Sequence, residues 1–257
     1  TVDSIVISAF VGVVSLGEYS NYTLVLTSMT GIINLVFTSL TSVIGHLCVE
    51  EDRKTAQKYC ESFHLLNFFI GTVFFLGYYA VIDNLIAILF SRALVITRDI
   101  SLVITLNGFV QFMRRNTLTF RDATGSFYSD RWKPLFEGIL NIGLSILFVK
   151  WIGVTGVILA TIITNLLICH IVEPYVLYKN AFDGPLYKYY LKNYSMIFSF
   201  SIAVVVLNAC VHSSQNGWGE LFLNGLMSIG ISTIVCIAWA ISHKKETMQL
   251  ASILRKG

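Results

Sequence analysis

Polar side chains recur at helical spacing inside the hydrophobic runs of this chain. Glu137, Asn141 and Ser145 are four residues apart, as are Thr161 and Asn165 in the next run. Side chains four residues apart share one face of an α-helix. Because a polar group that faces lipid is costly, such a face is expected to turn toward another helix or a hydrated cavity. The spacing therefore predicts contacts between helices or the wall of a wet path.

The composition places these stripes in a membrane. The 257 residues are 55% hydrophobic and 13% charged, and their mean hydropathy is +0.70. Soluble domains carry about 25% charged residues, and a helix needs about 20 apolar residues to cross the hydrocarbon. We therefore expect an all-α integral membrane protein with about eight transmembrane helices. The predicted spans are residues 4–17, 21–47, 62–82, 99–113, 134–151, 154–178, 193–211 and 221–242.

Basic residues are divided unequally between the connections. If the start of the first span is on the inner side, the inner connections receive all of the 18 Lys and Arg residues except Arg92, Arg98 and Lys150. Cytoplasmic loops carry an excess of basic residues. We therefore expect the stretch RDATGSFYSDRWKPLFEGILN, residues 121–141, and the C-terminus to be cytoplasmic. Connections around residues 90, 152 and 215 are predicted to be external.

Five residues could line a substrate path or couple transport to an ion: Asp3, Asn34, Asn107, Arg114 and Arg115. If a longer chain precedes Asp3, its carboxylate would lie in the membrane, where ionisable groups are functional candidates. Asn34 and Asn107 could bond to a neighbouring helix or face a hydrated path. Arg114 and Arg115 stand at the inner mouth of the fourth span, where they could attract an anionic group or anchor the helix.

Four other polar residues are expected to be structural: Glu137, Asn141, Asn165 and Glu173. The two glutamates lie near the cytoplasmic ends of their spans, where pairing with Arg131 or Lys133 is the favoured role. The stripe through Asn141 is expected to face the stripe through Thr161 and Asn165, because amide and hydroxyl groups join membrane helices by hydrogen bonds.

The sequence indicates no catalytic centre. It contains no Walker loop, no G-x-S-x-G elbow and no H-E-x-x-H pattern. The five cysteines and five histidines are scattered, and the one close His–Glu pair, His170 and Glu173, has no third ligand in view. We therefore expect no enzyme activity, no metal and no cofactor.

Three stretches resemble the C-terminal half of Wzx-type polysaccharide flippases, which belong to the multidrug/oligosaccharidyl-lipid/polysaccharide exporter superfamily. The stretches are VDSIVISAFVGVVSLGEYSNYTLV at 2–25, FRDATGSFYSDRWKPLFEGILNIGLSILFVKWIGVTGVILATIITNLL at 120–167, and EPYVLYK at 173–179. Positions that match the family pattern are Asp3, Gly12, Gly17, Tyr19, Ser20, Asn21, Tyr22, Glu137, Asn141, Gly153, Gly156 and Thr161. The likeness covers most of residues 1–180.

This resemblance implies a fold of two six-helix lobes with a central path between them, usually followed by two further helices. Residues 1–180 would be the second lobe, and residues 181–257 would be two additional transmembrane helices with a basic cytoplasmic tail. We accordingly expect this chain to be a fragment, lacking an N-terminal lobe.

The implied function is translocation of an undecaprenyl-diphosphate-linked oligosaccharide repeat unit across the bacterial cytoplasmic membrane, for capsule, exopolysaccharide or O-antigen assembly. The expected partners are this lipid-linked oligosaccharide, membrane lipids, the N-terminal lobe of the same chain and a polysaccharide polymerase. Nucleic acid is not expected. Two alternatives stay open: a small-molecule or drug antiporter of the same superfamily, which would need a coupling carboxylate such as Asp3, and a membrane-embedded glycan transferase.

Overall fold

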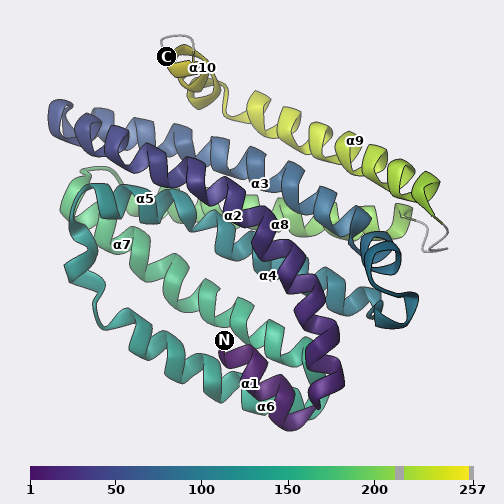
Figure 1. The fold of residues 1–257 in the computed structure, drawn as a ribbon. Helices are drawn as coiled ribbons and strands as arrows, with labels where there is room; N and C mark the ends of the chain where they lie inside the picture. Colours follow the sequence, from purple (N-terminus) through teal and green to yellow (C-terminus); the bar gives the residue numbers. More distant parts are fainter. Residues whose placement is uncertain (212–216, 255–257) are drawn as a thin grey trace.

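The computed structural model describes residues 1–211 and 217–254, which form an all-α protein (Figure 1). The α-helices are α1 (Val2–Phe10), α2 (Val13–Glu50), α3 (Arg53–Leu89), α4 (Arg98–Met113), α5 (Arg115–Ala123), α6 (Lys133–Thr164), α7 (His170–Ala181), α8 (Leu186–Cys210), α9 (Trp218–Ser242) and α10 (Lys244–Leu254). Short 3₁₀ turns, η1 (Arg92–Leu94) and η2 (Ser126–Asp130), and a π-helical turn, η3 (Asn165–Cys169), connect some of them.

Five of these helices are long and apolar enough to cross a membrane. They are α2, α3, the helical segment over Lys133–Ala181, α8 and α9. The protein is therefore an integral membrane protein, as the composition predicts. The predicted connection around residue 215 and the basic residues Arg255 and Lys256 lie outside the described residues.

The helix over Lys133–Ala181 folds into a hairpin at Ile152 and Gly153. Asn141 and Thr161 would lie about 30 Å apart along a straight helix, yet their side chains form a hydrogen bond of 2.9 Å. Gly153 has φ +58°, which favours glycine. The predicted division between the spans 134–151 and 154–178 is thus confirmed, and Figure 1 shows the two legs side by side.

The predicted division between the first two spans is wrong. Sequence reasoning places it after residue 17, but the chain breaks at Gly12, where φ is +120°, and α2 then runs without interruption to Glu50. Helix α1 has 9 residues, or about 14 Å, which is less than half of the hydrocarbon thickness. The apolar run hides this break because hydrophobicity continues through the glycine. The span predicted at 99–113 coincides in position with α4, but α4 has 16 residues and is not among the five helices long enough to cross a membrane. Among the described residues, the structure therefore supports five long apolar helices and not the eight transmembrane helices that the sequence predicts.

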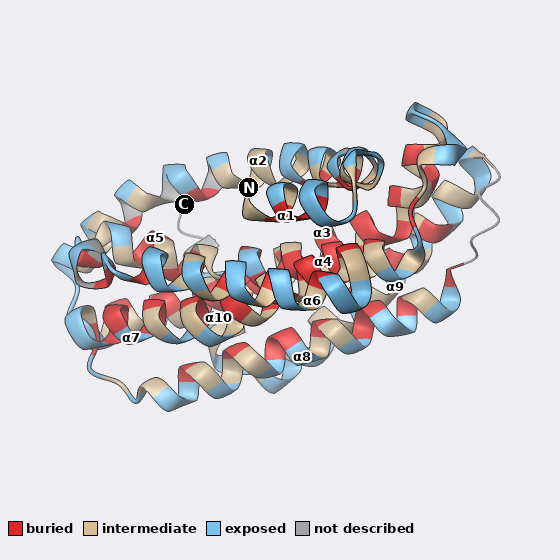
Figure 2. Ribbon diagram, turned by 90° about the horizontal axis from the view of Figure 1, so that it is seen from below, coloured by how far each residue is buried: buried red, intermediate tan, exposed pale blue. Residues whose placement is uncertain are grey.

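Helix α3 occupies the centre of the bundle and packs against α4, α8, α9 and α10, while α6 packs against α1 and α4. Aromatic side chains fill the space between α3, α4 and α8. Phe109 and Phe200 stack with ring centroids 3.6 Å apart, and Phe68 and Phe75 are fully buried beside them. Figure 2 shows the buried residues on the inward faces and the exposed ones on the outer faces of the helices. The outward apolar side chains are those that a bilayer would cover.

Candidate functional site

An open cavity of about 610 Å³ lies among α1, α2, α4 and α5. Sites for small molecules and cofactors usually occupy about 300–1,000 Å³. All five residues that the sequence suggested for a substrate path line this cavity: Asp3, Asn34, Asn107, Arg114 and Arg115. The structure therefore brings together residues separated by more than a hundred positions in the chain.

One wall of the cavity is a row of polar residues on α2, of which sequence reasoning nominated only Asn34. The row consists of Ser20, Thr23, Thr27, Thr30 and Asn34. We call it the α2 polar row. Its spacing alternates between three and four residues, which is the signature of one helix face. That signal is present in the sequence, but serine and threonine are also common in membrane helices where they bond only to their own backbone.

The opposite wall comes from α4. Gln111 donates a hydrogen bond of 3.1 Å to the side-chain oxygen of Asn107, one helical turn away. Asn107 is 8% exposed and Gln111 is exposed. Between them, a β-carbon at Gly108 would overlap the ring of Phe75 and press on Leu26. The glycine thus lets α4 approach α2 and α3 closely, which positions both amides at the cavity.

Asp3 connects the cavity to the α6 hairpin. Its carboxylate is 8% exposed and accepts a hydrogen bond of 2.8 Å from the hydroxyl of Thr161. The amide of Asn141 donates to the same hydroxyl at 2.9 Å, and the amide of Asn165 donates to the backbone oxygen of Thr161 at 2.9 Å. The predicted contact between the stripes of the two hairpin legs is therefore present, and it extends to α1.

Behind the cavity lies a compact cluster of four charges, Arg114, Lys133, Glu137 and Glu173, which we call the ion-pair cluster. Arg114 donates two hydrogen bonds to Glu173, at 2.5 and 3.1 Å, and Lys133 forms a short ion pair with the same carboxylate. Glu137 lies 3.5 Å from Lys133 and 4.0 Å from Arg114. Arg114 also reaches the side-chain oxygen of Asn165 at 2.5 Å. Two cations and two anions thus neutralise one another at this point.

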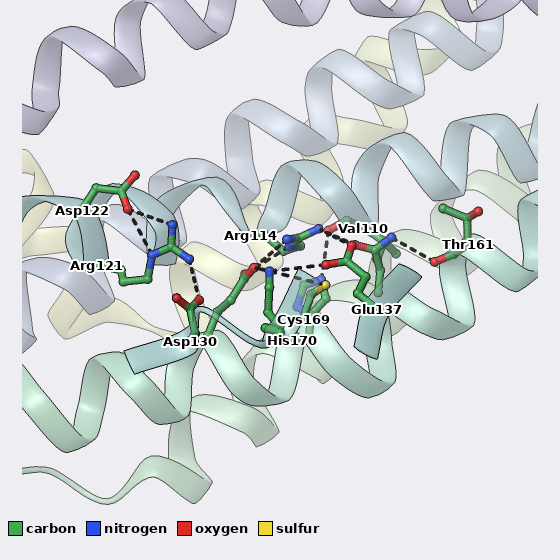
Figure 3. Close-up of polar contacts among 12 residues, drawn as sticks. Val110, Arg114, Arg121, Asp122, Asp130, Glu137, Thr161, Cys169 and His170 are labelled. Atoms are coloured by element: carbon green, nitrogen blue, oxygen red, sulfur yellow. Dashed lines mark hydrogen bonds and ion pairs between the residues drawn. The ribbon is translucent and has the colours of Figure 1, made fainter. Parts of the chain in front are cut away.

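Figure 3 shows how the ion-pair cluster joins separate elements. Arg114 stands at the junction of α4 and α5, while Glu137 and Thr161 come from the two legs of α6. Asn165 opens the π-helical turn η3. Single π turns in α-helices are often found at functional sites. Here the turn lies where the returning leg meets Arg114.

The two glutamates therefore have one expected partner and one unexpected partner. Lys133 pairs with both, as predicted. Of the two predicted alternatives, the structure thus selects Lys133, while the guanidinium of Arg131 lies over the ring of Tyr128, 4.7 Å from its centroid, and bonds to its hydroxyl. The pairing with Arg114 was missed, because 59 residues separate Arg114 from Glu173 and no local pattern connects them.

Arg115 differs from its neighbour. Its side chain is half-buried and lines the cavity, and it forms no ion pair with the residues that the structure describes. Arg114 has its charge compensated by Glu173 and Glu137. Arg115 is therefore the arginine whose charge is available to an anionic group in the cavity.

The charged stretch at residues 121–141 has a structural role that its composition alone does not reveal. Arg121 forms ion pairs with Asp122 at 2.9 Å and with Asp130 at 2.7 Å. These contacts close the connection between α5 and α6, and Figure 3 shows Glu137 beside Arg114. Lys133 lies 3.5 Å from Glu137 at the start of the hairpin.

No group of three or more His, Cys, Asp or Glu side chains within residues 1–211 and 217–254 is placed to hold a metal ion. His170, which the sequence set beside Glu173, instead contacts the backbone oxygen of Val110 at 3.0 Å and the amide of Asn193 at 2.9 Å. The ring nitrogens of His170 thus bond to Val110 and Asn193 and not to Glu173.

Comparison of the chain with known protein families, with curated proteins and with solved structures finds no match.

Proposed function

We propose that this chain belongs to a membrane transporter that moves undecaprenyl-diphosphate-linked oligosaccharide repeat units from the cytoplasmic to the outer leaflet of a bacterial cytoplasmic membrane. The family resemblance of residues 2–25, 120–167 and 173–179 supplies the substrate class. The observation that carries the proposal is the cavity, because it joins the carboxylate of Asp3, the amides of Asn34 and Asn107 and the guanidinium of Arg115 in one place.

The chemistry of such a substrate fits this lining. Its sugar head group and diphosphate need a hydrated, polar surface with a cation, whereas the prenyl tail is most stable in lipid. Arg115 is the cation proposed to attract the diphosphate, and Arg114 is withdrawn from that role by its two carboxylates. The structural residues lie behind the cavity wall. Glu137, Glu173 and Asn165 contact Arg114, and Asn141 bonds to Thr161.

In this proposal, residues 1–180 correspond to the second six-helix lobe of the transporter and residues 181–257 to the two additional helices. The side of the cavity along α2 is open, since Ser20 and Thr27 are exposed there. The first lobe would pack across that opening, and a polysaccharide polymerase is the further partner that the resemblance suggests.

The test uses the full-length protein in the bacterium that produces it. Arg115→Gln should reduce surface polysaccharide at least several-fold and cause lipid-linked repeat units to accumulate on the cytoplasmic side, because the cavity loses the arginine that forms no ion pair with the described residues. Lys188→Gln is the matched control, since Lys188 is an exposed basic residue on the side predicted to be cytoplasmic. Normal export by Arg115→Gln at matched protein abundance would contradict the role of Arg115, and export unaffected by deletion of the whole gene would contradict the function.

A small-molecule antiporter of the same superfamily is the second candidate, and the position of Asp3 favours it. A carboxylate that is nine-tenths buried, bound to Thr161 and in the cavity lining is suited to exchanging an ion. The deletion strain distinguishes the two functions. Accumulated lipid-linked repeat units indicate the flippase, whereas increased sensitivity to cationic dyes or drugs with normal polysaccharide indicates the antiporter.

A further inference from the structure

The hydroxyl groups of the α2 polar row all use their hydrogens in the same way. Ser20, Thr23, Thr27 and Thr30 each donate to a backbone oxygen of the preceding turn, at 2.7, 3.1, 2.8 and 2.9 Å respectively. A hydroxyl has one hydrogen to donate and two lone pairs that accept. With the hydrogen engaged by the helix, each hydroxyl offers only acceptor capacity to the cavity.

The facing wall adds unfilled polar capacity. The hydrogen bond between Gln111 and Asn107 uses one polar atom of each amide. The amide nitrogen of Asn107 and the oxygen of Gln111 have no partner in the described part of the chain. Asn107 is more than nine-tenths buried and lines the cavity. Both atoms reach the open cavity and not the closed protein interior, so a ligand in the cavity can complete these bonds in place of water.

The charges of the lining select against an acidic head group. Of the described ionisable side chains at the cavity, Asp3 forms no ion pair with another side chain, Arg114 is compensated by Glu173, and Arg115 has no ion pair. In the proposed function, Arg115 binds the diphosphate, so no second arginine without an ion pair remains in the lining for a sugar carboxylate. A carboxylate on a sugar would then meet acceptor oxygens and Asp3 without a cation of its own.

We propose that the α2 polar row, together with Asn107 and Gln111, binds the hydroxyl groups of an uncharged oligosaccharide head group. This inference rests on the proposed function. Sugar hydroxyls supply the donors that a row of acceptors requires, and their spacing along a glycan suits a row that rises along one helix face. The substrate is thereby narrowed to lipid-linked repeat units without uronic or other acidic sugars.

The same helix contains a matched control. Thr38 and Thr41 also donate to the backbone oxygen four residues earlier, at 2.8 and 3.3 Å, but neither lines the cavity. If the hydroxyls of the α2 polar row served only to satisfy their own helix, removing two of them would have the same effect as removing Thr38 and Thr41. Valine keeps the shape of threonine and removes the hydroxyl.

The experiment measures binding to the full-length protein in lipid nanodiscs by native mass spectrometry. The three probes are undecaprenyl diphosphate, the same lipid carrying an uncharged trisaccharide, and the same lipid carrying a trisaccharide with one uronic acid. The uncharged trisaccharide should strengthen binding about tenfold over the bare lipid, and the uronic acid should remove most of that gain. The double variant T27V/T30V should bind the uncharged trisaccharide lipid about tenfold more weakly and the bare lipid unchanged, whereas T38V/T41V should match the parent.

Each other outcome has one meaning. If the bare lipid binds and the trisaccharide adds nothing, or if both double variants lose equally, sugar recognition by the α2 polar row is overturned while the proposed function stands. Equal binding of the acidic and uncharged trisaccharides overturns the selectivity. Failure of all three lipids to bind overturns the proposed function, and the inference with it.

Discussion

The ion-pair cluster and the cavity wall contain similar side chains in opposite states. In the cluster, Arg114, Lys133, Glu137 and Glu173 compensate one another and Asn165 completes the bonding of Arg114. At the wall, Arg115 has no ion pair in the described chain, and the hydroxyls of the α2 polar row keep their lone pairs free. The number of polar groups therefore does not distinguish the proposed binding surface from a structural cluster. What marks it is hydrogen-bonding and charge capacity that the fold leaves unfilled.

The largest expected effect comes from breaking the cluster at its centre. Glu173→Gln leaves Arg114 and Lys133 buried without their shared carboxylate, and removing one partner from a buried ion pair costs about 3–5 kcal/mol. We expect the thermal unfolding temperature of the purified protein to fall sharply. Glu137→Gln is the control, since its contacts are longer and its side chain is 28% exposed, so it should cost less than about 1 kcal/mol. Equal losses would show that the cluster is not centred on Glu173.

Arg114 and Arg115 are adjacent in the chain, but one belongs to the ion-pair cluster and the other to the cavity wall, so the same substitution at each compares the two regions directly. Arg114→Lys keeps the charge but removes the paired hydrogen bonds to Glu173, and one bond to a charged group is worth about 2 kcal/mol. Arg115→Lys should change the free energy of unfolding by less than about 0.5 kcal/mol, because Arg115 bonds to no described side chain. Chemical or thermal denaturation of both variants measures the difference. A stability loss for Arg115→Lys as large as that for Arg114→Lys would remove the distinction between them.

A smaller effect is expected where the hairpin legs meet. Asn141→Leu removes the amide that donates to Thr161, and such interhelical bonds contribute about 1 kcal/mol in membrane proteins. Thermal stability should decrease accordingly. Thr161→Val should produce a similar loss, and the double variant should lose less than the sum because both changes remove the same bond. Unchanged stability of Asn141→Leu would mean that the contact does not join the legs.

The smallest effect on stability is expected at Asp3, which lies between the two regions. Asp3→Asn keeps the shape and can still accept the hydrogen bond from Thr161, so the unfolding free energy should change by less than about 0.5 kcal/mol. If the carboxylate serves coupling, polysaccharide export should nonetheless fall. Export at the parental level, with matched protein abundance, would restrict Asp3 to holding α1 against the hairpin.

Local pattern was sufficient for part of the site. Residues four apart on one helix face identified the stripe of Glu137 and Asn141 and its partner stripe at Thr161, because helical periodicity is a property of the chain itself. It was also enough to nominate Asp3, Asn107 and Arg115 as polar groups that a membrane would not leave in lipid. It could not separate Arg114 from Arg115, which have the same type, the same neighbourhood and the same predicted side of the membrane.

By itself, the sequence determined that the chain is helical and membrane-embedded, since apolar runs of this length can satisfy their backbone hydrogen bonds in lipid only as helices. It also determined the hairpin reversal at Gly153. The break at Gly12 is a local positive-φ turn, and it escaped prediction because the apolar run continues through it. The capture of Arg114 by Glu173 and the convergence of α1, α2, α4 and α5 on one cavity were decided by tertiary structure. Both depend on contacts between residues far apart in the chain, whose energies have no signature in any local window of residues.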